Sequence, residues 1–199
     1  MTRLGIFGGT FDPPHIGHLI LAEEACYQLE LERVLWVLTP NPPHKTDREI
    51  TPAGERLAML HAALAGAACF ELSTVDLDRP APHYAVDTVR LLRQKHPQAR
   101  LVYLLGGDSL NDLTTWHNPQ AFVDACDELG VMYRPGREVD LSALELALPG
   151  VAAKTRFLQA PLLEIASSQV RQRVAASQPF RYYLPEAVYQ VIQRRGLYR

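Results

Sequence analysis

The sequence predicts an α/β fold in which one parallel sheet is covered by helices on both faces. Short runs rich in Val, Leu and Ile alternate along the chain with stretches whose apolar residues follow a helical period. Strands of this composition that are each followed by a helix are typical of a buried parallel sheet. No internal repeat or low-complexity linker divides the 199 residues. We therefore expect a single domain spanning residues 1–199.

The expected elements alternate from one end of the chain to the other. The strands are Leu4–Phe7, Arg33–Leu38, Phe70–Thr74, Leu101–Leu105, Glu128–Tyr133 and Thr155–Leu158. The helices are Gly17–Leu29, Ala53–Ala65, Ala85–Lys95, Pro119–Cys126, Leu141–Leu148, Ser168–Ala176 and Pro185–Arg194. This order predicts a doubly wound, Rossmann-like parallel sheet, with the last helices, about residues 165–199, forming a C-terminal helical cap.

The composition is that of an ordinary globular protein. Apolar residues make up 47% and charged residues 21%, and the formal net charge is −2. This balance gives no positive field that would favour nucleic acid or a membrane surface as a partner. No apolar run approaches the roughly 18 residues of a membrane span, and the N-terminus lacks the apolar core of a signal peptide. We expect a cytoplasmic protein.

The three cysteines, Cys26, Cys69 and Cys126, are far apart in the sequence and form no CxxC pair. Each lies among apolar residues. We expect buried free thiols in a reducing compartment.

The segments that follow the strands hold the residues with unusual chemistry. In doubly wound sheets, ligands bind beyond the carboxyl ends of the strands. The segments at those ends are Gly8–His18, Pro40–Lys45, Gly106–Leu110, Arg134–Gly136 and Ile165–Arg171. The position in the fold and the residue types therefore indicate the same edge of the sheet.

The first segment belongs to the stretch GIFGGTFDPPHIGH, which reads as strand, glycine turn and helix. Gly8 and Gly9 let a ligand approach the backbone closely. The helix start offers unpaired N–H groups and a partial positive charge, which favour phosphate. His15 and His18, three residues apart, can share one side of the first turn and donate hydrogen bonds to charge that grows in a transition state.

Two other interpretations of this stretch remain open. The histidines can simply cap a solvated helix start, or Asp12, His15, His18 and His44 can bind a metal ion. Phosphate explains the glycines better than a metal does. The stretch is neither a GxxxxGK[ST] phosphate loop nor a GxGxxG dinucleotide fingerprint.

The second segment, PNPPHK, places His44 and Lys45 after the second strand in a loop stiffened by prolines. Lys45 suits a phosphate as a point charge. The alternative is a solvated basic loop.

The third segment, GGDSLNDLTTWH, begins where the fourth strand ends. Asp108 can accept hydrogen bonds from sugar hydroxyls, or hold a phosphate-bound Mg²⁺ through water. Trp116 can stack on an aromatic base, although core packing is the alternative for a tryptophan.

The fourth segment, IASSQVRQRV, offers Ser167 or Ser168 as the cap of a new helix. Arg171 lies on its first turn, so serine hydroxyls, free amides and a guanidinium indicate a second phosphate site. A capped surface helix is the alternative. Two phosphate-type helix starts, with no covalent catalytic triad apparent, favour direct nucleotidyl transfer.

These motifs resemble those of a known family. GGTFDPPHIGH resembles the HxGH signature of the nucleotidylyltransferase superfamily, and IASSQVR resembles its second motif, ISSTxIR. With PNPPHK, GGDSLNDLTTWH, RPG and the tail YYLPEAVYQVIQRRGLY, the chain is most similar to bacterial nicotinate-nucleotide adenylyltransferases over essentially its whole length.

The resemblance implies a reaction of ATP with nicotinate mononucleotide, assisted by Mg²⁺, that gives nicotinate adenine dinucleotide and pyrophosphate in NAD biosynthesis. It implies catalytic roles for His15, His18, Lys45 and Arg171. The implied ATP-binding residues are Gly8, Gly9, Thr10, Phe11, His15, His18, Gly106, Asp108, Ile165, Ser167, Ser168 and Arg171. The implied residues for nicotinate mononucleotide are Lys45, Tyr84, Ala85, Trp116 and Arg134. No protein-bound metal is implied.

The sequence departs from the family at a few positions. Ala85 stands where the family usually has a threonine beside the pyridine carboxylate, Ala166 replaces a serine of the second motif, and the proline-rich loop is short. Pro82 precedes a helical pattern, so we expect backbone N–H groups at a helix start near Tyr84 or Ala85 to bind the carboxylate.

Other functions share part of this pattern. A pantetheine-phosphate adenylyltransferase would keep the HxGH and serine–arginine motifs, and a non-catalytic nucleotide sensor would keep the fold. A fragment of a class I aminoacyl-tRNA synthetase would need a KMSKS-like loop and a basic surface, both missing from the sequence. We expect ATP and nicotinate mononucleotide as partners, no nucleic acid or membrane, and a monomer or small homo-oligomer.

Overall fold

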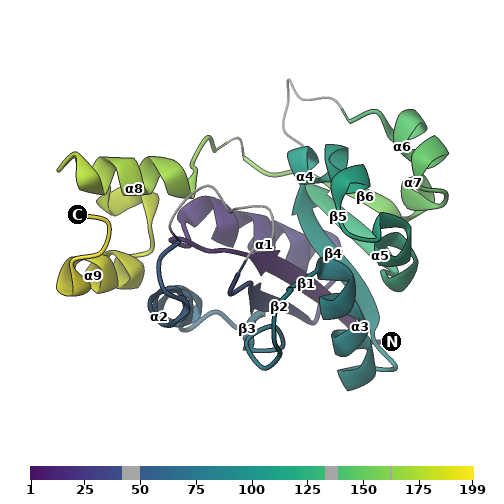
Figure 1. The fold of residues 1–199 in the computed structure, drawn as a ribbon, viewed down its shortest axis with the longest axis horizontal. Helices are drawn as coiled ribbons and strands as arrows, with labels where there is room; N and C mark the ends of the chain where they lie inside the picture. The colour runs from purple at the N-terminus through teal and green to yellow at the C-terminus, as the bar shows by residue number, and fades with distance from the viewer. Residues whose placement is uncertain (42–49, 133–138, 162) are drawn as a thin grey trace.

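The computed structural model describes residues 1–41, 50–132, 139–161 and 163–199. Six parallel strands form one sheet in the order β3-β2-β1-β4-β5-β6 (Figure 1). The strands are β1 (Arg3–Gly9), β2 (Arg33–Leu38), β3 (Phe70–Ser73), β4 (Arg100–Gly106), β5 (Glu128–Met132) and β6 (Thr155–Leu158). The chain leaves β1 in one direction through β2 and β3, and returns to the other side of β1 for β4. The order therefore reverses at β1 and β4, which confirms the doubly wound, Rossmann-like sheet.

The helices are α1 (Ile16–Gln28), α2 (Ala53–Leu64), α3 (Ala85–Lys95), α4 (Gly107–Asn111), α5 (Pro119–Ala125), α6 (Leu141–Ala147), α7 (Val151–Lys154), α8 (Ser167–Ala175) and α9 (Glu186–Arg195), with 3₁₀ turns η1 (Leu113–Thr115) and η2 (Arg181–Tyr183). Each predicted helix is present, with ends that differ by one residue or not at all. The sequence did not predict α4, α7, η1 or η2, which are too short to show a helical period. Within the described ranges, no helix has the length and apolar character needed to cross a bilayer.

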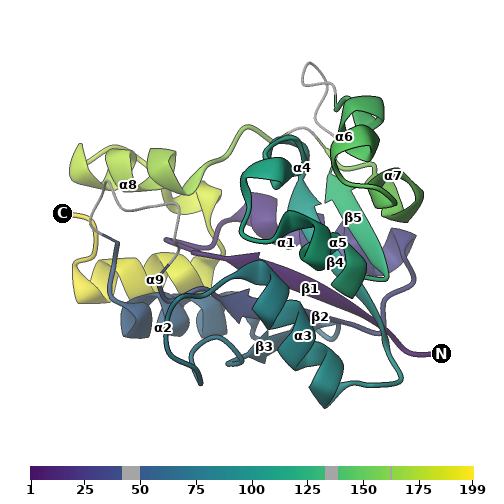
Figure 2. The ribbon, with the colours of Figure 1, turned by 45° about the vertical axis from the view of Figure 1, so that its right-hand side comes forward.

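The two faces of the sheet are buried against different helices (Figure 2). On one face, Val86 and Val89 of α3 and Phe122 of α5 pack against strand residues such as Ile6. On the other face, residues of α1 and α2 pack around Trp36, a fully buried residue of β2. Both faces are therefore dry, which explains why the strand sequences are almost continuously apolar.

A third apolar cluster holds the C-terminal helices to the sheet domain. Met59 and Ala63 of α2 pack against Val170 of α8 and against Val188 and Ile192 of α9. Figure 1 shows α9 beside α2 and α8 above α9, on the side away from the amino terminus. The predicted C-terminal helical cap is therefore present, and it packs on α2.

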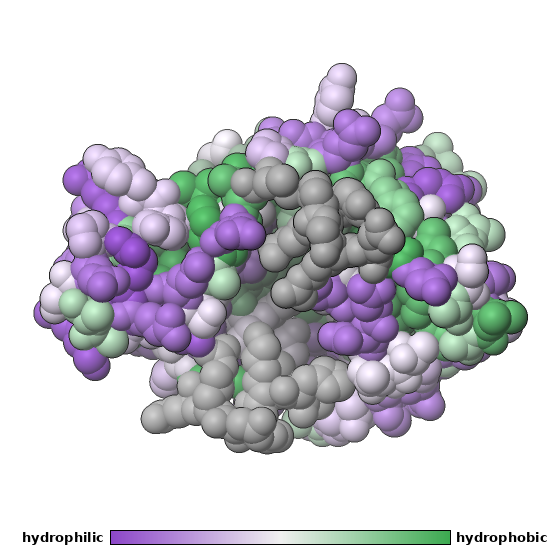
Figure 3. All heavy atoms as spheres, turned by 90° about the horizontal axis from the view of Figure 1, so that it is seen from above, coloured by the Kyte–Doolittle hydropathy of each residue, from purple (hydrophilic) through white to green (hydrophobic). Residues whose placement is uncertain are grey.

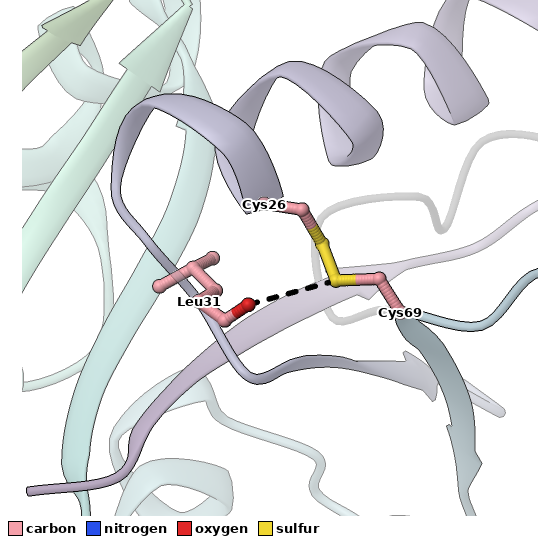
Figure 4. The surroundings of a disulfide bond; sticks show 3 residues. All are labelled: Cys26, Leu31 and Cys69. Atoms are coloured by element: carbon pink, nitrogen blue, oxygen red, sulfur yellow. Dashed lines mark hydrogen bonds between the residues drawn. A yellow bond between two sulfur atoms is a disulfide. The ribbon is translucent and has the colours of Figure 1, made fainter.

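The structure corrects the expectation for two of the cysteines. Cys26, near the end of α1, and Cys69, just before β3, form a disulfide with their Cα atoms 6.8 Å apart (Figure 4). Both are half-buried, whereas Cys126 is buried and free as expected. The pair is 43 residues apart in the sequence. The two residues meet because β3 is an edge strand of the sheet and α1 covers the face on which Cys69 packs.

The contact between Cys69 and Leu31 belongs to the same disulfide. The Sγ atom of Cys69 lies 3.8 Å from the carbonyl oxygen of Leu31 (Figure 4). A sulfur in a disulfide carries no proton, so this contact becomes a hydrogen bond only in the reduced thiol.

Candidate active site

The candidate site lies where β1 and β4 end, at the point where the strand order reverses. The start of α8 is hydrogen-bonded to the loop after β1 at this end of the sheet, and the short helix α4 follows the neighbouring strand β4. Figure 3 shows the molecule from above, with a hollow near the middle of that face. The sequence predicted this location from the ends of the strands.

His15 and His18 stand side by side on the first turn of α1. Their rings stack with centroids 3.5 Å apart and an interplanar angle of 21°. The backbone N–H of His15 donates to Nδ1 of His18 at 3.1 Å. Because Nδ1 of His18 accepts this bond, a neutral His18 carries its proton on Nε2. The predicted pairing of the two histidines on one side of the turn is present.

An aromatic wall orients His18. The Phe11 ring lies 5.3 Å from the His18 ring in an edge-to-face arrangement, and the Phe7 ring lies at 6.0 Å. Phe11 is buried. Its φ is 46°, a left-handed backbone conformation that few residues with a side chain adopt. These contacts limit rotation of the His18 ring.

The glycines near this wall are required by side-chain packing. A Cβ at Gly9 would lie 2.8 Å from the Phe11 ring, and a Cβ at Gly8 would lie 2.7 Å from the Tyr103 hydroxyl. A Cβ at Gly17 would come within 3.1 Å of the His15 ring. At Gly106, by contrast, a Cβ would meet no atom of the described residues within 4 Å. Contacts within the protein therefore account for Gly8 and Gly9, whereas no described side chain accounts for Gly106.

The start of α8 is bound to the loop that precedes α1. Ser167 Oγ donates to the Pro13 carbonyl oxygen at 2.9 Å, and Arg171 Nη1 donates to the Asp12 carbonyl oxygen at 2.6 Å. Two helix starts that the sequence identified separately are therefore adjacent. Such a pair offers backbone N–H groups and two positive helix ends to one polyanion.

The predicted serine cap of α8 is wrong. The residue at the N-cap position is Ala166, and Gln169 Oε1 accepts a hydrogen bond from its N–H at 3.1 Å. Ser167 is the first helical residue, and its hydroxyl donates to the Pro13 carbonyl oxygen instead of capping the helix. Ser168 is exposed and Ile165 is half-buried at the same helix start.

A second group of predicted residues gathers at the start of α3. The helix begins at Ala85 with Tyr84 at the N-cap position, as expected. The Tyr84 ring stacks on the His117 ring, with centroids 3.8 Å apart and an interplanar angle of 17°. His117 follows Trp116 in the chain, so this stack brings the tryptophan segment to the helix start, whose first N–H groups lack an intrahelical acceptor.

Trp116 packs partly against the core, the alternative that the sequence offered beside stacking on a base. Its ring is half-buried and packs against Phe122, with centroids 5.1 Å apart, and against Tyr103 at 6.2 Å. Burial raises the pKa of Tyr103, whose hydroxyl therefore stays protonated. Trp116 belongs in part to the core and in part to the surface beside Tyr84.

Arg79 supports the start of α3, and sequence reasoning missed it. Its guanidinium lies 2.9 Å from the Asp76 carboxylate and donates to the carbonyl oxygens of Pro82 at 2.7 Å and Tyr84 at 3.3 Å. Thr88 Oγ1 donates to the same Asp76 carboxylate at 2.8 Å. No pattern around Arg79 in the sequence signals these partners.

Arg56 was also missed, although the sequence carries a signal for it. It is buried, and it donates to the carbonyl oxygens of Thr10, Thr39, Pro40 and Thr51 at 2.6–3.0 Å. It therefore joins the loops after β1 and β2 to the start of α2. Arg56 lies three, four and seven residues before Met59, Leu60 and Ala63, so it shares the apolar face of α2 with them. A charged residue on the buried face of a helix is unusual unless it has hydrogen-bond partners there.

The other predicted residues divide by location. His44, Lys45, Arg134 and Gly136 lie outside the described residues. Thr10 is half-buried in the loop after β1, and Asp108 is half-buried in α4. Within the described residues, no three His, Cys, Asp or Glu side chains come together in a group that could hold a metal ion, and His44, the fourth candidate ligand, lies outside them.

The chain is similar to known proteins over most of its length. Residues 6–173 match the family described as cytidylyltransferase-like. The chain is 49% identical over 199 residues to a probable nicotinate-nucleotide adenylyltransferase of Thermomicrobium roseum, covering 100% of this chain and 92% of that protein. It is 39% identical over 196 residues to a probable nicotinate-nucleotide adenylyltransferase of Roseiflexus sp., covering 98% of each.

A solved structure shows the same fold at low sequence identity. It is the Plasmodium falciparum nicotinic acid mononucleotide adenylyltransferase complexed with NaAD, with a TM-score of 0.81 and 19% identity. The alignment covers 100% of this chain and 98% of that chain.

Proposed function

The chain belongs to the cytidylyltransferase-like family and, within it, to the nicotinate-nucleotide adenylyltransferases, and we propose that it transfers the adenylyl group of ATP to nicotinate mononucleotide. A phosphate oxygen of the mononucleotide attacks the α-phosphorus of ATP, and the bond from that phosphorus to the β-bridging oxygen breaks. The products are nicotinate adenine dinucleotide and pyrophosphate. The reaction is a step of NAD biosynthesis.

The observation that carries this proposal is the junction of α1 and α8. Ser167 and Arg171 bind the backbone of Pro13 and Asp12, so the two helix starts face one region beside His15 and His18. A triphosphate fits such a region because anions are stabilised at helix N-termini.

We assign His18 to the reacting phosphate. Its Nε2–H donates to a non-bridging oxygen of the α-phosphate, where negative charge grows in the transition state. His15, Ser168 and Arg171 bind the other phosphate oxygens, and Ser167 contributes its backbone N–H at the first position of α8. Lys45, which lies outside the described residues, adds a point charge to either substrate's phosphates.

Direct transfer is favoured over a covalent histidine intermediate. A nucleophilic imidazole attacks through the nitrogen that has no proton. In His18 that nitrogen, Nδ1, already accepts the N–H of His15. The histidine is therefore arranged as a donor.

The two ends of the product are assigned to the two sides of this region. Asp108, in the first turn of α4, and Gly106, where an added Cβ would meet no described atom within 4 Å, support the adenosine side. The start of α3 at Ala85, beside the stacked Tyr84 and His117, supports the nicotinate side. Trp116 stacks on the pyridine ring, and Arg134, outside the described residues, completes this side.

Mg²⁺ is proposed to arrive on the phosphates of ATP. Mg²⁺ keeps several water ligands and typically needs few protein carboxylates when a nucleotide supplies phosphate oxygens. This fits a site with donors for phosphate and, within the described residues, no cluster of metal ligands. When bound, the ion neutralises phosphate charge, and Asp108 is the candidate to hold it through water.

The test is an acceptor panel. ATP and Mg²⁺ are offered with nicotinate mononucleotide, nicotinamide mononucleotide or phosphopantetheine, and pyrophosphate release is measured together with the mass of the product. We expect nicotinate adenine dinucleotide as the main product. Release with phosphopantetheine alone would make the protein a pantetheine-phosphate adenylyltransferase, and ATP binding without any release would make it a nucleotide sensor.

A further inference from the structure

We propose that Tyr198 is a positioning residue for ATP binding, which it controls by holding Asp12 and, through Asp12, the guanidinium of Arg171. The inference rests on the proposed function in one respect, namely that Arg171 binds phosphates of ATP. Tyr198 itself is not assigned any contact with a substrate.

The first contact joins the segment after α9 to the loop after β1. The Tyr198 hydroxyl donates to Asp12 Oδ1 at 2.8 Å and lies 3.7 Å from Met59 Sδ. Asp12 is only 1% exposed. A hydrogen bond to a buried carboxylate is stronger than one in water, and its loss is correspondingly costly.

The environment keeps Tyr198 protonated and therefore a donor. Burial raises the pKa of its hydroxyl, and the negative charge of Asp12 raises it further. Thr51 and Arg56 act on the hydroxyl in the opposite direction without reversing the shift. Tyr198 therefore donates to Asp12 throughout the ordinary pH range.

The second contact joins the same Asp12 to the phosphate side of α8. Arg171 Nη1 donates to the Asp12 carbonyl oxygen at 2.6 Å and stands 3.9 Å from its carboxylate Oδ2. The Asp12 carbonyl uses one of the five N–H donors of a guanidinium. Asp12 thus binds Tyr198 through its side chain and Arg171 through its backbone.

The fold brings the three residues together from distant parts of the chain. Tyr198 and Asp12 are 186 residues apart, and Arg171 and Asp12 are 159 apart. The chain turns back after α9 at Gly196, whose φ is +60°. Packing of α9 on α2 places this turn beside Met59.

The geometry indicates what removal of the hydroxyl does. Without the Tyr198 hydroxyl, the buried Asp12 carboxylate loses one hydrogen-bond donor. Its attraction to the Arg171 guanidinium, whose Nη1 stands 3.9 Å from Oδ2, then favours a shorter ion pair. Closing that gap turns the guanidinium towards Asp12 and away from ATP. The expected consequence is weaker ATP binding with unchanged binding of nicotinate mononucleotide.

The experiment uses Tyr198→Phe in the full chain, which keeps the ring and removes the hydroxyl. The KM for ATP and the Kd for ATP measured by calorimetry are both expected to rise about tenfold. Loss of one hydrogen bond to a charged group typically changes a dissociation constant by about this factor or more. The KM for nicotinate mononucleotide is expected to change by less than about twofold, which is small beside the tenfold change expected for ATP.

The matched control is Tyr189→Phe. Tyr189 packs in the same apolar cluster and loses the same atom, but its ring faces Phe180 and Arg181 instead of Asp12. We expect no change in ATP binding for this variant. Equal losses of ATP affinity in both variants would make the effect a general one of the cluster and would overturn the proposal.

A double-mutant cycle tests whether Tyr198 acts through Arg171. If it does, Tyr198→Phe has little further effect on the ATP Kd when Arg171→Lys is already present, because coupled residues are not additive. Additive losses, an unchanged ATP Kd in Tyr198→Phe, or equal changes in KM for both substrates would each overturn the proposal.

The proposed function can fail separately. If the unmodified protein binds ATP but forms no dinucleotide, the function is wrong, and the ATP Kd values still test the role of Tyr198. If the unmodified protein binds no ATP, both proposals are wrong.

Discussion

The backbone N–H of His15 donates to Nδ1 of His18, and the two rings stack 3.5 Å apart. A residue at a helix N-cap thereby selects the tautomer of a residue on the same turn. The proton of a neutral His18 is on Nε2, while Phe7 and Phe11 restrict the ring. The hydrogen bond from His15 and the two phenylalanine rings therefore hold the Nε2–H of a neutral His18 in one orientation.

Replacing His18 with alanine is expected to reduce turnover about 10²–10³-fold, the usual cost of removing one donor to developing charge. ATP affinity should change little, because the bond is strongest in the transition state. Single-turnover rates and the calorimetric Kd for ATP measure the two effects. His61→Ala, at an exposed position of α2, is the control. Turnover close to that of the unmodified protein would exclude this role for His18.

Replacing Trp116 with alanine is expected to raise the KM for nicotinate mononucleotide about tenfold and to spare ATP binding. Stacking of an aromatic side chain on a base contributes about 1–3 kcal/mol, which is the scale used here. Because Trp116 also packs on Phe122, the Tm should fall as well. Trp116→Phe should recover part of both effects. A lower Tm with an unchanged KM would place the tryptophan in the core alone.

The unmodified protein is expected to prefer nicotinate mononucleotide over nicotinamide mononucleotide by at least about tenfold in kcat/KM. The start of α3 at Ala85 offers backbone N–H groups to the carboxylate, and one hydrogen bond to a charged group is worth about 1.5–3 kcal/mol. Ala85→Thr should sharpen the preference modestly. Equal kcat/KM values for the two mononucleotides would refute selection by the backbone.

Breaking the disulfide between Cys26 and Cys69 is expected to lower the free energy of unfolding by up to about 4 kcal/mol. The estimate follows from the closure of a loop between residues 43 apart in the sequence. Urea unfolding of the Cys26→Ser, Cys69→Ser double variant measures it, and KM values should stay unchanged because Cys26 lies in the last turn of α1, away from His15.

Cys126→Ala is the control for the same experiment. Cys126 is buried and unbonded, so a reducing agent should destabilise this variant as much as it destabilises the unmodified protein. If reduction leaves the unfolding midpoint of the unmodified protein unchanged, the disulfide makes no contribution.

Elements with a clear period were predictable nearly to the residue. The bounds of β2 at Arg33–Leu38 and of α3 at Ala85–Lys95 are those expected from the sequence. The helix α7, Val151–Lys154, was missed because four residues cannot display a 3.6-residue period. Local pattern therefore predicts long elements and fails for single turns.

The candidate site was predictable in place and only partly in its contacts. The rule that ligands bind at strand ends selected the loop of His15 and the start of α8. Ser167 or Ser168 was expected to cap α8, but the N-cap is Ala166 and the Ser167 hydroxyl donates to Pro13, 154 residues away in the chain. A local hydrogen bond was displaced by one that exists only after folding.

The sequence by itself determined the alternation of strands and helices, the glycine turns and the helix start at His15, because these depend on residues within a few positions of one another. Only the tertiary structure decided that Cys26 meets Cys69, that Arg171 meets Asp12 and that Tyr198 reaches the same aspartate. Those pairs depend on the order of strands in the sheet and on the packing of α9 against α2. Sequence distance carries no information about such contacts, since the free energy that brings them together comes from burying the whole core.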